Sequence, residues 1–319
     1  MIGAYLLAVF TELIFGFSFI FTKAALDYVT PNQLLAFRFM TAAFLLTLLR
    51  VLRVVDIKLK NRPIKKVLLL ALCEPVLYFT FETTGINLTT ASEAGLMIAL
   101  IPVLVTLLAA LFLKEIPSPL QAASIIISVL GVGFIILGGG GITTSGHTMG
   151  LLALLGAVFS AALFTTLSRW LSQQFRPVEL TYVMMWAGAV FFGGLALTQN
   201  SLTPSQTLSL LQRKEVWAAV LYLGVLSSVV AFFGMNYFIA KIGAARAAIF
   251  TNLTTIVSVA AGIGLLGEPF HWYHLVGGVL ILLGVAGTNR FGPQDRQVAS
   301  GNSTGTSVKT TVSSAGSTR

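Results

Sequence analysis

The strongest constraint in this sequence is an apolar stretch of bilayer length that occurs twice. Residues 91–115 read ASEAGLMIALIPVLVTLLAALFLKE, and residues 244–268, which lie 153 positions later, read AARAAIFTNLTTIVSVAAGIGLLGE. About 20 apolar residues in a helix cross the hydrocarbon core of a bilayer. Small residues at the start of both stretches allow membrane helices to approach closely. We therefore expect a membrane protein built from two related halves.

Composition narrows the fold class further. The chain of 319 residues is 56% hydrophobic and only 10% charged, whereas a soluble domain carries about 25% charged residues. Its apolar runs are continuous rather than alternating, which favours helices over the strands of a barrel. We predict an all-α polytopic membrane protein with ten transmembrane helices. The expected spans are residues 3–25, 33–53, 65–86, 91–113, 118–138, 149–171, 178–199, 216–239, 244–266 and 270–290.

The basic residues predict the orientation of these spans. Most of the 20 Lys and Arg residues fall on one side of the membrane if the basic loop after the second span is cytoplasmic. The positive-inside rule then places both termini in the cytoplasm, and it explains the net charge of +9 without a nucleic-acid partner. Glu12 interrupts the first apolar run and no basic n-region precedes that run, so we expect a retained helix rather than a signal peptide.

Each half holds five spans, an odd number, so the two halves insert with opposite topology. Inverted repeats are typical of secondary transporters, whose substrate sites lie near the bilayer midplane between the repeats. We predict a first five-helix repeat over residues 1–141 and a second over residues 148–290. Residues 291–319 are rich in Ser, Thr and Gly, which indicates a disordered cytoplasmic tail.

Short motifs recur in register with these spans. In the first half they are Phe15, Gly16, Phe17, Ser18, Lys23, Pro31, Arg38, residues 91–94, Pro102, Val103, Glu115, Gln121 and Gly131. In the second half they are Arg169, Pro177, residues 244–247, Gly267, Glu268, Pro269 and Gly284. Together with the duplication, they resemble the ten-helix EamA-type members of the drug/metabolite transporter superfamily over residues 1–290. Phe15 and Thr255 depart from that family, which often has tryptophan and proline there.

The resemblance implies two inverted EamA repeats and a secondary transporter that works by alternating access. It implies a permease of the bacterial inner membrane that exports amino acids or related metabolites. Exchange with protons is one way in which such a permease drives export. The partners of such a protein are a small-molecule substrate, the lipid bilayer and protons.

Two other classes of membrane protein stay open at this point. A scaffold or receptor without transport would tolerate replacement of its buried acids. An intramembrane enzyme needs a nucleophile with its base, or metal ligands, at midplane depth. The histidines, His147, His271 and His274, fall in or near loops with no HExxH motif or Cys/His cluster, so we predict no metal, no cofactor and no enzymatic activity.

Four carboxylates fall inside the expected spans, and all belong to the first half: Glu12, Glu74, Glu82 and Glu93. A carboxylate near the bilayer centre costs at least a few kcal/mol unless it is paired, hydrated or protonated, so such residues are functional candidates. Glu12 and Glu74 lie near the middle of their spans, and we predict that they handle the charge of a substrate or of protons. The alternative is a protonated carboxyl group bonded to a neighbouring helix.

The third span carries two further signals beside Glu74. Pro75 follows it directly and is expected to kink the helix, because proline lacks the N–H that the helix needs. Tyr78 lies one turn beyond Glu74 on the same face. Its hydroxyl either contacts the substrate or belongs to a packed core residue.

Basic side chains near the outer ends of the spans suggest an ion-pair cluster. Arg38 is expected to pair with Glu82 or Glu93, and Lys23 with Asp27 at i,i+4 or with the same two acids. We interpret Lys23, Arg38, Glu82 and Glu93 as a structural cluster; an outer gate or a carboxylate-binding site is the alternative.

The second half supplies neutral polar groups. Thr251, Asn252 and Thr255 lie near the middle of the ninth span, and Thr251, Thr255 and Ser258 share one face. This face either forms a polar wall opposite Glu74 or serves only helix packing. Ser227, at the position that repeats Glu74, is a weaker candidate of the same kind.

Two acids fall between helices instead of inside them. Glu115 and Glu268 occupy matching positions at the ends of the two repeated stretches. A carboxylate before a helix can cap its N-terminus, so we expect each of them to cap the helix that follows.

Overall fold

The computed structural model describes residues 2–59, 62–113, 118–138, 146–199, 210 and 212–291, apart from the side chains of 109–113 and 245. The helices of the first half are α1 (Ile2–Leu26), α2 (Pro31–Val51), α3 (Ile64–Ala71), η1 (Leu72–Leu77), α4 (Tyr78–Leu88), α5 (Ala91–Ile98), α6 (Ile101–Leu113) and α7 (Pro119–Gly138). Those of the second half are α8 (Gly146–Leu171), α9 (Pro177–Thr198), α11 (Lys214–Leu221), η2 (Tyr222–Ala231), α12 (Phe232–Ile242), α13 (Ala244–Leu266) and α14 (Trp272–Arg290).

The helices agree with the expected spans. Within the described ranges, nine are long and apolar enough to cross a membrane. The tenth expected span is the interrupted helix α3–η1–α4, which carries Lys65, Lys66, Glu74 and Glu82. The linker expected between the halves and the predicted tail lie mostly outside the described residues.

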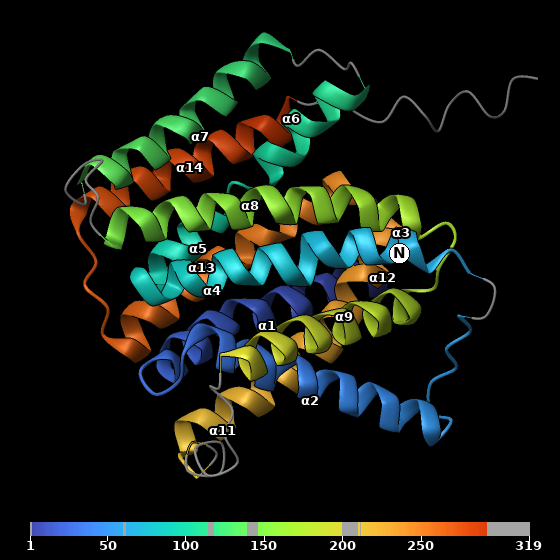
Figure 1. The fold of residues 1–319 in the computed structure, drawn as a ribbon. Coiled ribbons are helices and arrows are strands. Elements are labelled where there is room, and N and C mark those ends of the chain that lie inside the picture. Colours follow the sequence, from blue (N-terminus) through green and yellow to red (C-terminus); the bar gives the residue numbers. More distant parts are fainter. Residues whose placement is uncertain are drawn as a thin grey trace, which may run out of the picture.

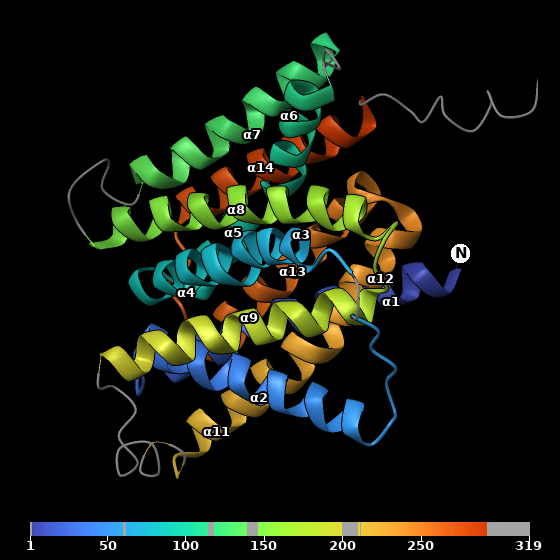
Figure 2. The same ribbon diagram turned by 45° about the vertical axis from the view of Figure 1, so that its right-hand side comes forward.

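The most closely associated helices come from opposite halves of the chain. The pair α7 and α14 lies along one edge of the molecule, and the pair α2 and α9 lies toward the opposite edge (Figure 1). Between these pairs, α4 packs on α8 and α1 packs on α13, an arrangement that Figure 2 shows from a second direction. The pairs α7–α14 and α2–α9 join helices at matching positions, as expected for two repeats related by a pseudo-two-fold axis, whereas α4–α8 and α1–α13 join helices at different positions of the two repeats.

Small residues bring α7 and α14 together. A Cβ atom added at Gly131 would lie 2.7 Å from the carbonyl oxygen of Gly277 and 2.9 Å from the backbone of Ile281. Ser128 also donates a hydrogen bond of 3.2 Å to the Ile281 carbonyl oxygen. Such close contact is how membrane helices associate where burial of apolar surface gives no driving force.

Two helices are interrupted at matching positions of the repeats. In the first half the break is at Glu74, whose φ of −150° and ψ of 116° are not helical, and the Glu74–Pro75 peptide bond is cis. The non-helical backbone at Glu74 is the kink that Pro75 predicts. In the second half, η2 is wound more loosely, with π-type bonding, around Ser227, the position that repeats Glu74. The first interruption lines the central cavity through Glu74, and the second contacts Arg38, which lines the same cavity.

Candidate functional site

A cavity of about 60 Å³ lies between the two halves. This volume suffices for ordered water, and a polar wall gives such water its partners. The polar lining consists of Glu12, Ser18, Arg38, Glu74, Tyr78, Glu82, Thr165, Thr251 and Thr254. The apolar lining includes Phe15, Phe19, Phe79, Phe164, Phe238, Ile98 and Ile101.

Glu74 lies at the kink and lines this cavity. The side chain is 5% exposed, and it forms no hydrogen bond with any residue that the structure describes. Its charged neighbours within electrostatic range are Arg38, Glu82 and Glu12. Burying a charged carboxylate without a partner costs free energy. Binding of a proton or of a ligand cation to Glu74 would remove that cost.

Glu12 of α1 is bound by a residue that the sequence analysis overlooked. Thr254 of α13 places its hydroxyl 2.6 Å from Glu12 Oε2 and 3.0 Å from the Glu12 carbonyl oxygen. Thr251 also lines the cavity, one turn before Thr254. The i,i+3 spacing of these two threonines was a usable signal, because residues three apart share a helix face.

The other residues expected on this face of α13 do not line the cavity. Thr255 donates a hydrogen bond of 2.8 Å to the Gly95 carbonyl oxygen of α5, and Ser258 donates one of 3.0 Å to the Thr255 carbonyl oxygen. Both therefore serve helix packing. Asn252 is half-buried and lies outside the cavity lining.

Arg38 of α2 is held by the second half of the chain. Its Nε and Nη2 donate hydrogen bonds of 2.8 Å to Ser228 and to Ser227 of η2, and its guanidinium carbon lies 4.1 Å from the ring centre of Phe79. The prediction that Arg38 forms an ion pair with Glu82 or Glu93 is wrong, because no carboxylate lies within 4 Å of Arg38 in the described part of the chain. The two adjacent hydroxyl groups of the loosely wound η2 bind Arg38 where a carboxylate was expected.

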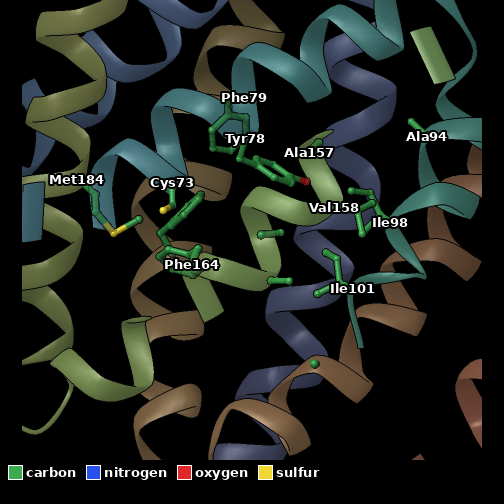
Figure 3. Close-up of a cluster of buried hydrophobic side chains, with 14 of the residues drawn as sticks. Cys73, Tyr78, Phe79, Ala94, Ile98, Ile101, Ala157, Val158, Phe164 and Met184 are labelled. Carbon is green, nitrogen blue, oxygen red and sulfur yellow. The ribbon is translucent and has the colours of Figure 1, made fainter. Parts of the chain in front are cut away.

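Glu82 and Tyr78 belong to the cavity and not to an outer cluster. Glu82 lines the cavity and accepts a hydrogen bond of 3.1 Å from Thr83. Figure 3 shows the Tyr78 side chain reaching toward Ala157 and Val158 of α8. The ring packs edge-on against Phe79, so Tyr78 is a core residue that also lines the cavity.

Lys23 forms no ion pair with Asp27, Glu82 or Glu93, contrary to the expectation. Its ammonium group donates hydrogen bonds of 2.9 Å to the Ile86 carbonyl oxygen and 2.5 Å to that of Thr89. These carbonyl groups end α4, where a helix lacks its own donors and where a cation is favourable. Lys23 is thus a C-terminal cap for α4, and Asp27 remains exposed.

Glu93 joins three helices through two histidines. His147 of α8 and His274 of α14 donate to its Oε1 at 2.9 and 3.0 Å. Its Oε2 accepts from the Thr90 N–H and hydroxyl at 3.1 and 3.2 Å, a capping box that begins α5. No three-ligand metal arrangement occurs among the described residues. No local sequence pattern predicts this contact, because both histidines are far from Glu93 in the chain.

Glu268 caps a helix in the opposite half. It accepts hydrogen bonds of 2.7 Å from the Ala91 N–H, 2.9 Å from the Ser92 N–H and 2.6 Å from the Ser92 hydroxyl. The expectation that it caps α14 is therefore wrong. Gly267 adopts a left-handed conformation at φ 65°, which turns the chain so that Glu268 reaches α5. Glu115 lies outside the described residues.

Comparison with protein-family models identifies the family of this chain. The model of the EamA-like transporter family matches residues 2–137 and 148–290, one copy in each half. The chain belongs to the EamA-like transporter family. It is therefore a membrane transporter and not an enzyme, as the sequence predicted, and the alternative of an intramembrane enzyme falls away.

Relatives extend over most of this EamA chain. The uncharacterized transporter YcxC of Bacillus subtilis is 36% identical over 90% of this chain and 92% of its own length. A probable terminal-alkyne amino-acid exporter of Streptantibioticus cattleyicolor is 30% identical over 63% of this chain and 64% of its own length. A solved crystal structure with 18% identity covers 92% of this chain and 99% of its own, with a TM-score of 0.66, which supports the fold alone.

Proposed function

We propose that this EamA-family transporter exports amino acids or related amines by alternating access, with protons moving through Glu74. The observation that carries the proposal is the Glu74 carboxyl group at the helix break, which lines the cavity between the repeats and has no hydrogen-bond partner among the residues that the structure describes. A group in this position can release a proton when it binds an ammonium group, and it can regain a proton when the substrate leaves.

The amino-acid part of the proposal has one support outside this chain. The Streptantibioticus cattleyicolor relative bears the name of a probable amino-acid exporter. Within this chain, Glu12 and Glu82 add two further carboxyl groups to the same cavity, which favours a ligand that carries an ammonium group.

We further propose that the protein lies in a bacterial inner membrane with both termini in the cytoplasm, as its basic residues predict. In this orientation, the cavity opens inward to load the substrate and outward to release it. The residues around the N-terminus of α5 then lie near the outer surface.

Transport in proteoliposomes with an imposed pH gradient tests this function. Radiolabelled apolar amino acids and small amines are offered to the wild type, to Glu74→Gln and to Glu215→Gln. Glu215 is a suitable control because it lies in the first turn of α11, outside the cavity lining, with a side chain 34% exposed.

We expect flux that follows the pH gradient in the wild type and in Glu215→Gln, and loss of the gradient response in Glu74→Gln. Flux that does not depend on the gradient in the wild type, or a gradient response that persists in Glu74→Gln, would contradict the role of Glu74. Absence of flux for the whole panel, from protein shown to be folded, would contradict the proposed substrate class.

A further inference from the structure

We infer that Arg38 binds the carboxylate of the substrate, which makes zwitterionic amino acids, and not simple amines, the preferred ligands. The inference rests on the proposed function and deepens it. It starts from the fact that Arg38 is 1% exposed, lines the central cavity and has no carboxylate within 4 Å in the described part of the protein.

The partners of Arg38 orient its guanidinium group without neutralising it. Both Ser227 and Ser228 are uncharged, and both contact the same edge of the group, through Nη2 and Nε. The opposite edge presents Nη1 and the second N–H of Nη2, because a guanidinium has five donors in a fixed plane. This free edge has the spacing that binds a carboxylate through two parallel hydrogen bonds.

A cation in this position is expensive for the folded protein. Arginine inside a membrane span normally pairs with an acid or faces water. Glu82 and Glu74 attract Arg38 electrostatically, but they stop short of an ion pair. A ligand carboxylate on the free edge would supply the missing negative charge.

The same cavity also provides a partner for the ammonium group of a zwitterionic ligand. Glu74 lines it without a hydrogen-bond partner among the described residues, so it is available for an ammonium group. Phe15, Phe19 and Phe79 supply an apolar wall beside these charges. Once the two halves separate to enlarge the cavity, the arrangement suits an amino acid with an apolar or aromatic side chain. An amine of the same shape leaves Arg38 unpaired, and sites built for a polar group reject analogues that lack it.

Binding to the purified full-length protein in detergent tests the inference. The probes are L-phenylalanine, L-leucine and L-methionine, each compared with the amine that lacks its carboxylate: phenethylamine, isoamylamine and 3-(methylthio)propylamine. Dissociation constants come from ligand-induced shifts in thermal unfolding. We expect the wild type to bind the amino acids about tenfold or more tightly than the amines.

Variants distinguish the effect of the positive charge of Arg38 from the effect of its orientation by the two serines. Arg38→Met should remove the preference for amino acids over amines, and Arg38→Lys should keep part of the preference. Ser227→Ala combined with Ser228→Ala should weaken amino-acid binding alone, because the serines act only through Arg38. Arg213→Met is the control, since Arg213 is exposed and contacts Tyr28 outside the cavity.

Each outcome decides a separate question. Equal binding of amino acids and amines by the wild type, or an unchanged preference in Arg38→Met, would overturn the role of Arg38 and leave the proposed function standing. Failure of the wild type to bind any of the six probes would overturn the proposed function, and this inference with it.

Discussion

The carboxylates at the start of α5 and those of the central cavity have different surroundings in this transporter. In the α5 cap, which we define as Glu93, Glu268, His147 and His274, both acids have hydrogen-bond donors on each oxygen. In the central cavity, Glu74 has no donor among the described residues.

The difference indicates two uses of the same side chain. Hydrogen bonds to a carboxylate stabilise the fold, because each is stronger than a bond between neutral groups. A charge buried without partners costs free energy, and it persists where function requires it. We therefore expect substitutions in the α5 cap to lower stability, and substitutions of Glu74 to change transport alone.

The largest loss of stability is expected for Glu268→Ala. This change leaves two N–H groups at the start of α5 and the Ser92 hydroxyl without their acceptor. The free energy of unfolding should fall by about 3 kcal/mol. Equilibrium denaturation in detergent micelles measures this fall, with Glu215→Ala as the matched acid. An equal effect of the two variants would show that the α5 cap contributes nothing specific.

A smaller effect is expected from the link between Glu93 and His274. A double-mutant cycle with Glu93→Gln and His274→Ala should give a coupling free energy of about 2 kcal/mol, because both side chains are buried. The same cycle with His147→Ala should give less, since the His147 side chain is 32% exposed. Equal couplings would mean that burial does not govern the strength of these contacts.

The comparison also explains which parts of the site could be predicted. Glu74, Glu12 and Thr251 were expected to lie on a pathway, and all three line the cavity. The signal was local, because an acid in the middle of an apolar run is costly wherever that run packs. Their roles in transport stay predictions. The all-helical fold could be predicted for a similar reason, since bilayer-length apolar runs are local features too.

Partners on other helices, distant in the sequence, could not be predicted in this way. Lys23, Arg38 and Glu268 were each assigned partners close in sequence or of opposite charge, whereas the structure gives each a neutral group on another helix. Such partners depend on which faces of the two halves meet and on where the helices are interrupted. A single sequence carries no record of that packing.

A modest effect is expected where the cavity contains a partnered acid. Thr254→Val removes the hydroxyl that lies 2.6 Å from Glu12 Oε2 and keeps the shape of the side chain. The free energy of unfolding should fall by about 1 kcal/mol, and Thr254→Ser should restore most of it. Thermal unfolding of the three proteins measures the difference. A Thr254→Val protein as stable as the wild type would place Glu12 in the same class as Glu74.

The smallest effect on stability is expected for Glu74→Gln. The substitution keeps the volume and removes a group that can become charged, and no hydrogen bond to a described residue is lost with it. The free energy of unfolding should change by less than about 0.5 kcal/mol, although the response of transport to a pH gradient is lost. Denaturation of the same preparation that is used for transport makes the two results comparable. A loss as large as that of Glu93→Gln would show that Glu74 has a structural partner, and the distinction between the cavity and the α5 cap would then fail.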